Sequence, residues 1–134
     1  MQPGKVRVAI ASDQDIVLAR RRGRAIAAEI GFSAFDATLL ATAISELARN
    51  IVVYAGKGEV MLQMIHNSSR QGIMITASDS GPGIPDLRQA MRDGFSTSGS
   101  LGLGLPGVRR LVDEFTIASE VGRGTTVIVK KWKS

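Results

Sequence analysis

The segment from Asp36 to Ala55 constrains the fold of this chain more than any other, because its apolar residues recur with the period of an α-helix. Apolar residues three and four positions apart lie on one helix face, and a face this wide must be buried against other elements. We expect the helix to begin near Asp36 and to end before Gly56. The apolar stripe consists of Leu39, Leu40, Ala43, Ile44, Leu47, Ala48, Ile51 and Val52.

The other expected elements indicate the fold class. Alternation of polar and apolar residues predicts a strand over 5–10, and Ser12 with Asp13 caps a helix that stops at Gly31. The remaining strands are expected at 59–65, 73–77, 115–121 and 125–131, with a helix over about 105–114. Mixed helices and hairpins in this order predict an α+β fold, a two-layer α/β sandwich with a mixed sheet.

The segment from Ser80 to Gly104 is the expected place for chemistry. It is 25 residues long and rich in glycine. Connections longer than about 12–15 residues are usually functional or disordered. A short helical piece is expected within it, around 86–92.

Composition excludes several classes of function. The chain has 134 residues, which suits a single domain over 1–134, and it contains no cysteine, so disulfides and thiolate chemistry are absent. His66 is the single histidine, which argues against a multi-histidine metal site. Because no apolar run reaches the roughly 18 residues of a membrane span, we expect a cytoplasmic protein without a membrane partner.

The net charge of +5 leaves nucleic acid or an anionic nucleotide as potential ligands. Aromatic residues make up only 4% of the chain, so a base-stacking platform for single strands is poorly supplied. We therefore expect no nucleic-acid partner.

Glu46 and Asn50 are the first candidate functional residues. They are four positions apart and share one face of a strongly apolar helix. One interpretation is a polar stripe that faces water. The other is a carboxylate that accepts a proton next to an amide oxygen that coordinates a hard cation such as Mg²⁺.

Asp79 follows a strand and precedes Gly81 and Gly83. Such a carboxylate can accept a hydrogen bond from an exocyclic amine, while the glycines let a flat ring approach the backbone. An ordinary turn is the alternative, because these are common turn residues.

Gly102 and Gly104 precede another helix, whose N-terminus would favour a polyphosphate. The spacing also spells G-x-G-x-x-G, but no strand directly precedes it, so a dinucleotide-binding fold is excluded. The segment from Gly122 to Thr125 by itself is a hairpin turn.

Together, in this order, these segments resemble the N, G1, G2 and G3 boxes of the GHKL ATPases, which include gyrase, Hsp90, histidine kinases and the MutL family. Longer local stretches resemble the switch kinases of bacterial stressosomes, serine/threonine kinases related to the anti-sigma-factor kinases. Those stretches are 44–51, 54–58, 79–86 and 94–99.

The resemblance implies a Bergerat fold that binds ATP and Mg²⁺ beneath a mobile lid at about 80–104. Asp79 would then bind the adenine amino group with help from Thr125, and Gly81 and Gly83 would lie near the base. Asn50 would hold Mg²⁺ against the phosphates.

The resemblance also assigns the transfer chemistry. Gly102 and Gly104 would line the triphosphate, and Glu46 would be the general base. Tyr54, one turn beyond the asparagine of the N box, would pack near the nucleotide, with an ordinary core aromatic as the alternative.

The resemblance further implies partners. A histidine kinase needs a phospho-acceptor histidine, whereas His66 lies in an expected hairpin turn; gyrase and MutL types need a second domain. A kinase that acts in trans fits better. Its substrates would be STAS-domain proteins of the stressosome, and after release it would activate a downstream regulatory enzyme such as a PP2C-type phosphatase.

The alternative function is a nucleotide-gated binding module, anti-sigma-like or a co-activator, with little kinase activity. Two further segments keep two interpretations each. The basic run from Arg20 to Arg24 either docks an acidic partner or is the solvated side of a helix, and 96–98 either bind phosphate or form a flexible loop.

Overall fold

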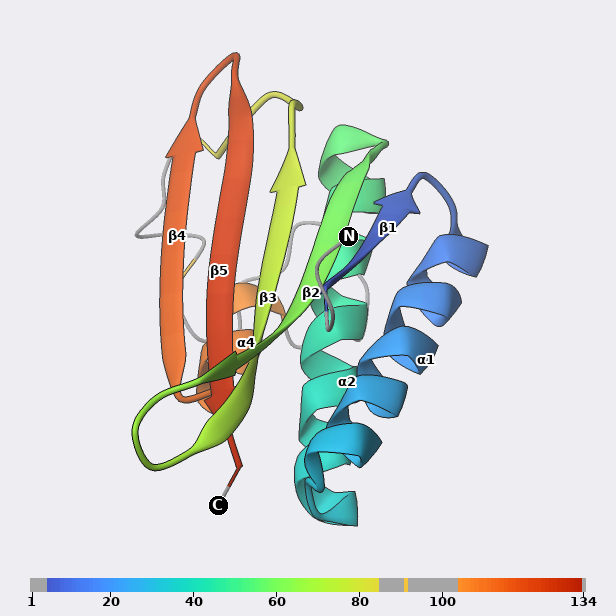
Figure 1. Cartoon of the computed structure of the whole chain (residues 1–134). Coiled ribbons are helices and arrows are strands. Elements are labelled where there is room, and N and C mark those ends of the chain that lie inside the picture. Colours follow the sequence, from blue (N-terminus) through green and yellow to red (C-terminus); the bar gives the residue numbers. More distant parts are fainter. Residues whose placement is uncertain (1–4, 85–90, 92–103, 134) are drawn as a thin grey trace.

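The computed structural model describes residues 5–84, 91 and 104–133, and it confirms the expected order of helices and strands. Most of the expected helical piece at 86–92 lies outside the described residues. The elements, labelled in Figure 1, are β1 (Lys5–Ile10), α1 (Asp13–Ile30), α2 (Ala34–Asn50), the π-helix η1 (Ile51–Ala55), β2 (Gly58–His66), β3 (Gln71–Asp79), α4 (Gly104–Leu111), β4 (Glu114–Glu120) and β5 (Gly124–Trp132).

The five strands form one sheet in the order β1-β2-β3-β5-β4 (Figure 1). Every neighbouring pair in this sheet is antiparallel, so the expectation of a mixed sheet is wrong. The reason is the place of β5. The strands β3 and β4 run in the same direction, but β5 lies between them and runs opposite to both.

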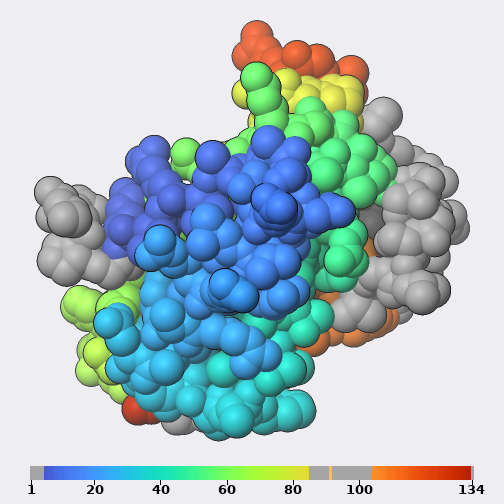
Figure 2. Space-filling view, turned by 90° about the vertical axis from the view of Figure 1, so that its right-hand side faces the viewer, coloured from blue at the N-terminus to red at the C-terminus, as the bar shows by residue number. Residues whose placement is uncertain are grey.

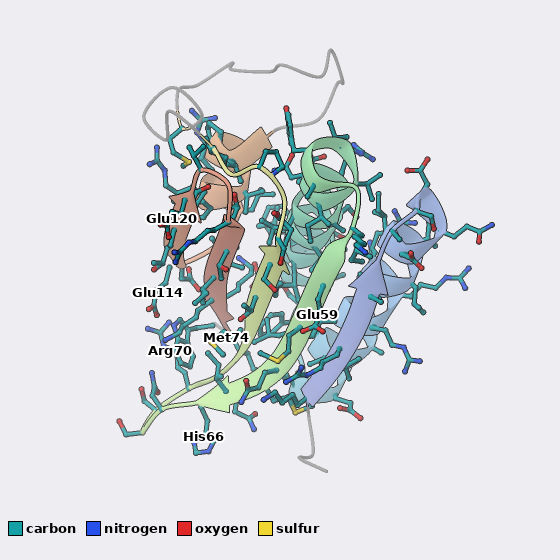
Figure 3. All side chains as sticks on the ribbon, turned by 90° about the horizontal axis from the view of Figure 1, so that it is seen from above. Glu59, His66, Arg70, Met74, Glu114 and Glu120 are labelled. Atoms are coloured by element: carbon teal, nitrogen blue, oxygen red, sulfur yellow. The ribbon has the colours of Figure 1, made fainter. Side chains whose placement is uncertain are left out.

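The helices cover one face of this sheet, which gives the expected two layers (Figure 1). Alternate strand residues such as Val60, Ile75 and Val129 point toward the helices and are fully buried in the core. Residues in between point to the other face, which carries Glu59 and Met74, labelled in Figure 3.

Both long helices begin and end where the local chemistry dictates. The carboxylate of Asp15 accepts hydrogen bonds from the backbone N–H groups of Ala11 and Ser12, which fixes the start of α1. Gly31 ends α1 with a φ of +94°, a conformation that glycine adopts without strain. The hydroxyl of Ser33 accepts from Asp36 N and caps α2, two residues before the expected start.

The helices α1 and α2 pack closely. A Cβ atom at Gly23 would overlap the side chain of Ile44, so the small residue permits this approach. The opposite side of α1 faces solvent, and Figure 2 shows this helix in blue across the outer face of the molecule. Within the described residues, no helix is long and apolar enough to cross a membrane.

The helix α4 ends at Leu111, three residues before its expected end. The ammonium group of Lys131 donates to the carbonyl of Leu111 at 3.0 Å and so caps the helix. Asp113 is already bonded to β5, because its N–H donates to Lys130 O and its carboxylate accepts from Trp132 N. The long-range pairing of β5 thus overrides the helical pattern of this segment.

Candidate active site

A cavity of about 260 Å³ opens between the helices and the ends of β3 and β5. Its walls are mostly apolar, and the lining also carries the polar groups of Asn50, Tyr54, Asp79 and Thr125. This combination is typical of a small-molecule site. The full lining consists of Leu47, Asn50, Ile51, Tyr54, Ala55, Ala77, Asp79, Pro82, Gly83, Ile84, Gly104, Leu105, Thr125 and Val127.

The helix α2 contributes Asn50 to this cavity and holds Glu46 one turn earlier. Glu46 is only 8% exposed, although it carries a carboxylate. Its Oε1 atom lies 3.4 Å from a guanidinium nitrogen of Arg49, whose side chain is 42% exposed. The polar stripe on this helix therefore does not simply face water. Glu46 is a buried carboxylate that is paired with Arg49, and it lies next to the cavity rather than in its lining.

The π-helix η1 continues α2 along the cavity. Gly56 N donates to Ile51 O at 2.8 Å, a five-residue spacing that defines this wider turn. Single π-turns of this kind occur frequently at functional sites. Tyr54 lines the cavity and is 47% exposed, so the alternative of an ordinary core aromatic is wrong.

The carboxylate of Asp79 lies at the end of β3, directly across from Thr125 of β5. Its Oδ1 atom accepts the N–H of Gly81 at 2.9 Å, which fixes the orientation of the carboxylate and leaves Oδ2 available to a ligand. Gly81 does not line the cavity itself. A Cβ at Gly81 would come within 2.6 Å of the Cβ of Ala55, so this glycine allows the loop after β3 to approach η1.

Gly83 lines the cavity and has a φ of +79°. A Cβ at this position would collide with the carbonyl group of Glu120, so both the conformation and the space require glycine. The neighbouring Pro82 carbonyl accepts from Gly122 N at 2.9 Å. The loop after β3 is thus attached to the β4–β5 hairpin, and what looked like an ordinary turn forms one wall of the site.

Ser119 of β4 is a site residue that the sequence analysis did not identify. Its hydroxyl accepts from Ile84 N at 2.7 Å and lies 2.7 Å from the hydroxyl of Thr125. It also lies 3.2 Å from the carbonyl of Gly124. A signal was present in the sequence, because Ser119 follows the inward-facing Phe115 and Ile117 at a spacing of two in the expected strand.

The N-terminus of α4 reaches the cavity at Gly104, which has a φ of +67°. Backbone N–H groups at a helix N-terminus favour an anionic ligand. Gly102, most of the expected lid at 80–104, and the polar segment 96–98 lie outside the described residues.

Two other expected features lie away from this cavity. In the basic run on α1, Arg21, Arg22 and Arg24 are exposed and Gly23 is buried, so the run is at least the solvated side of the helix. His66 is exposed at the β2–β3 hairpin, where Figure 3 shows it at the outer end of the strands.

Comparison with known families defines the class of this protein. Residues 35–133 match the family described as histidine kinase-, DNA gyrase B-, and HSP90-like ATPase, and the chain belongs to this family. The GHKL resemblance of the sequence is thereby confirmed, as is the ATPase fold. Membership implies that the chain binds ATP.

Comparison with curated proteins defines the particular kinase. The chain is 53% identical to serine/threonine-protein kinase RsbT of Bacillus subtilis (strain 168) over 125 residues, which cover 93% of this chain and 94% of that protein. It is 30% identical to the anti-sigma F factor of Geobacillus stearothermophilus over 80% of this chain and 77% of that protein. The chain is therefore a GHKL-type serine/threonine-protein kinase homologous to RsbT.

Solved structures of low sequence identity share the fold. The crystal structure of the RsbU and RsbW domains of Rv1364c from Mycobacterium tuberculosis matches with a TM-score of 0.68 and 19% identity, over 97% of this chain and 33% of that chain. The mycobacterial sensor histidine kinase MprB matches with a TM-score of 0.57 and 19% identity, over 96% of this chain and 98% of that chain.

Proposed function

We propose that this chain works as one kinase domain that binds Mg·ATP in the cavity and transfers its γ-phosphoryl group to a serine or threonine of a separate protein. The observation that carries this proposal is the lining of one cavity by Asp79, Thr125, Asn50 and Gly104. The first two would meet the adenine base, and the last two the phosphates. The apolar remainder of the lining suits a flat purine ring.

The donor set fits a shared magnesium ion. Within the described residues, no group of three or more histidine, aspartate or glutamate side chains could hold a metal by itself. Mg²⁺ is often bound by one or two protein ligands together with substrate phosphates and water. Asn50 would supply the protein oxygen, and the bound ion would neutralise charge on the phosphates.

Glu46 would act as the general base toward the acceptor hydroxyl. It is buried on the same helix face as Asn50, one turn away, and its ion pair with Arg49 holds one carboxylate oxygen. Phosphoryl transfer depends mainly on positioning and charge stabilisation. A fixed carboxylate next to the cavity supplies the proton acceptor that the incoming hydroxyl needs.

The relationship to RsbT supports a proposal for the partners. We propose that the substrates are STAS-domain proteins of a cytoplasmic stressosome, and that the kinase, once released, activates a downstream regulatory enzyme such as a PP2C-type phosphatase. The 53% identity over almost the whole of both chains supports this assignment. The position of His66 at the end of β2, in a hairpin rather than on a helix, supports an acceptor in another protein.

A second candidate is a nucleotide-gated binding module with little kinase activity. The relatives named anti-sigma F factor favour it, because they match over most of this chain at about 30% identity. In this function, the cavity would bind nucleotide only to set the shape of a partner-binding surface.

Transfer of labelled γ-phosphate from Mg·ATP to a purified STAS-domain protein of the stressosome separates the two functions. We expect acid-stable label with the wild type, and a loss of about 10²–10⁴-fold with Glu46→Ala, the usual effect of removing a general base. Glu59→Ala is the matched control, because Glu59 lies on the opposite face of the sheet and pairs with Arg7. It should transfer phosphate like the wild type.

Other results would overturn the proposal. Acid-labile label would indicate histidine phosphorylation. ADP binding without any label would favour the binding module, and equal activity of Glu46→Ala and wild type would remove Glu46 from the mechanism.

A further inference from the structure

Ser119 joins three segments around the base-binding part of the cavity without lining the cavity itself. Its hydroxyl accepts the N–H of Ile84 at 2.7 Å. On its other side lie the hydroxyl of Thr125 at 2.7 Å and the carbonyl of Gly124 at 3.2 Å. A serine hydroxyl has one hydrogen, so it can donate to only one of these two acceptors.

The distances favour donation to Thr125. Hydrogen bonds between a hydroxyl and an oxygen are usually 2.7–2.8 Å long, which matches the Ser119–Thr125 contact and not the longer contact with Gly124 O. When Ser119 donates to Oγ1 of Thr125, the hydrogen of Thr125 is free to point into the cavity. In the opposite arrangement, that hydrogen is directed at Ser119 and the cavity receives only a lone pair.

The polarity of this bond determines what the cavity offers to a base. Asp79 and Thr125 are paired across β3 and β5, so an acceptor, the carboxylate, and a donor, the threonine hydroxyl, lie side by side. Adenine presents an amino donor next to a ring-nitrogen acceptor on its Watson–Crick edge. Hypoxanthine and guanine present a carbonyl acceptor next to a ring N–H donor, the reverse pattern.

We propose that Ser119 is a positioning residue that sets the specificity of the site for adenine by orienting the hydroxyl of Thr125. The proposal rests on the proposed binding of ATP in this cavity. Ser119 also holds Ile84 N, so the same hydroxyl fixes the wall against which the base would lie.

Dissociation constants of ADP and of inosine diphosphate, measured by calorimetry, test this role. Inosine diphosphate has the same shape as ADP but the reversed donor and acceptor pattern. We expect Ser119→Ala to weaken ADP binding about 5–10-fold, the effect of one hydrogen bond, and to change inosine diphosphate binding by less than about 2-fold. Ser119→Thr keeps the hydroxyl and should restore the ADP preference.

Two further variants keep the test independent of folding defects in Ser119→Ala. Thr116→Ala removes a hydroxyl from the exposed face of the same strand and should bind both nucleotides like the wild type. Thr125→Val removes the group on which Ser119 acts while keeping the side-chain shape. It should lose the same preference for ADP, and adding Ser119→Ala to it should change the preference no further.

Equal weakening of both nucleotides by Ser119→Ala would assign it a merely structural role and overturn the inference. An unchanged ratio of the two dissociation constants in Thr125→Val would do the same. Wild-type protein that binds neither nucleotide would overturn the proposed function together with this inference, whereas the first two results leave ATP binding intact.

Discussion

Apart from the N-terminus of α4, the cavity has two walls that are built in different ways. The helix wall comes from one continuous segment, α2 and η1, where helical spacing alone places Asn50, Ile51 and Tyr54 side by side. The strand wall combines β3, the loop after it and the β4–β5 hairpin. These segments are joined by hydrogen bonds between distant residues, such as those between Ser119 and Ile84 and between Gly122 and Pro82. The helix wall is thus specified locally, whereas the strand wall exists only in the folded protein.

In the proposed function, this difference separates catalysis from recognition. The proposed transfer groups lie on or beside the helix wall, where Glu46 pairs with a partly exposed arginine. The groups proposed to read the base lie on the strand wall, where each is held by a backbone or hydroxyl partner. Substitutions in the helix wall should therefore reduce phosphate transfer, whereas substitutions in the strand wall should weaken nucleotide binding.

Asn50→Ala should have the largest effect, and it should reduce the rate of phosphate transfer. We expect phosphate transfer to fall more than about 100-fold, because the charge stabilisation by a bound metal ion is worth several kcal/mol. ADP binding without Mg²⁺ should change by less than about 3-fold. Labelled transfer at varied Mg²⁺ and calorimetry with ADP measure the two effects.

Asn67→Ala is the control for this variant, since Asn67 lies in the exposed β2–β3 turn. Normal transfer by Asn50→Ala at saturating Mg²⁺ would mean that the helix wall does not hold the metal ion.

Asp79→Asn should have an intermediate effect, and it should weaken the binding of ADP. The amide keeps an oxygen for Gly81 N but removes the charge that the amino group of adenine would meet. Hydrogen bonds to a charged group contribute about 1.5–3 kcal/mol, so ADP should bind about 10–100-fold more weakly. The rate of transfer at saturating ATP should fall much less.

Calorimetry and steady-state kinetics on the same preparation measure both quantities for Asp79→Asn. A fall in the maximal rate with unchanged affinity would contradict the division of labour between the two walls.

The smallest expected effect compares two glycines of the strand wall in thermal unfolding. Gly83 and Gly122 have nearly equal φ values, +79° and +84°, but a Cβ would collide with Glu120 only at Gly83. Gly122→Ala should cost about 1 kcal/mol for the left-handed conformation alone. Gly83→Ala should cost about 1–3 kcal/mol more, because the loop must also move.

Melting temperatures of the two alanine variants, with and without ADP, check this expectation. Equal destabilisation would mean that the contact between the loop and the hairpin is loose, and that the strand wall is not preorganised.

Much of the fold was predictable from the sequence because it depends on local patterns. All five strands were expected near their observed positions, β1 from the alternation of polar and apolar residues, and the glycine after α1 marked the end of that helix. The errors arose where contacts between distant segments determine the position of a strand or the end of a helix. Nothing local indicates that β5 lies between β3 and β4, and nothing local ends α4 at Leu111, where Lys131 of β5 caps it.

The site shows the same division. Asn50 was predicted from its helical spacing, and Asp79 from its place between a strand and two glycines. The resemblance added Tyr54 and Thr125, and all four residues line the cavity. Ser119 was missed because its importance lies in hydrogen bonds to Ile84 and Thr125, which the sequence does not display. Spacing alone also could not show that Gly81 acts from behind the cavity lining.

The central position of β5 also bears on how the protein is made. A nascent chain that has emerged only as far as β4 contains the helix wall and Asp79, but it lacks Thr125 and the strand that both β3 and β4 pair with. Such a chain has two open sheet edges, which makes it prone to aggregate, and it has no complete base-binding wall. We therefore expect truncated products that lack residues 124–132 to bind nucleotide poorly in the proposed site.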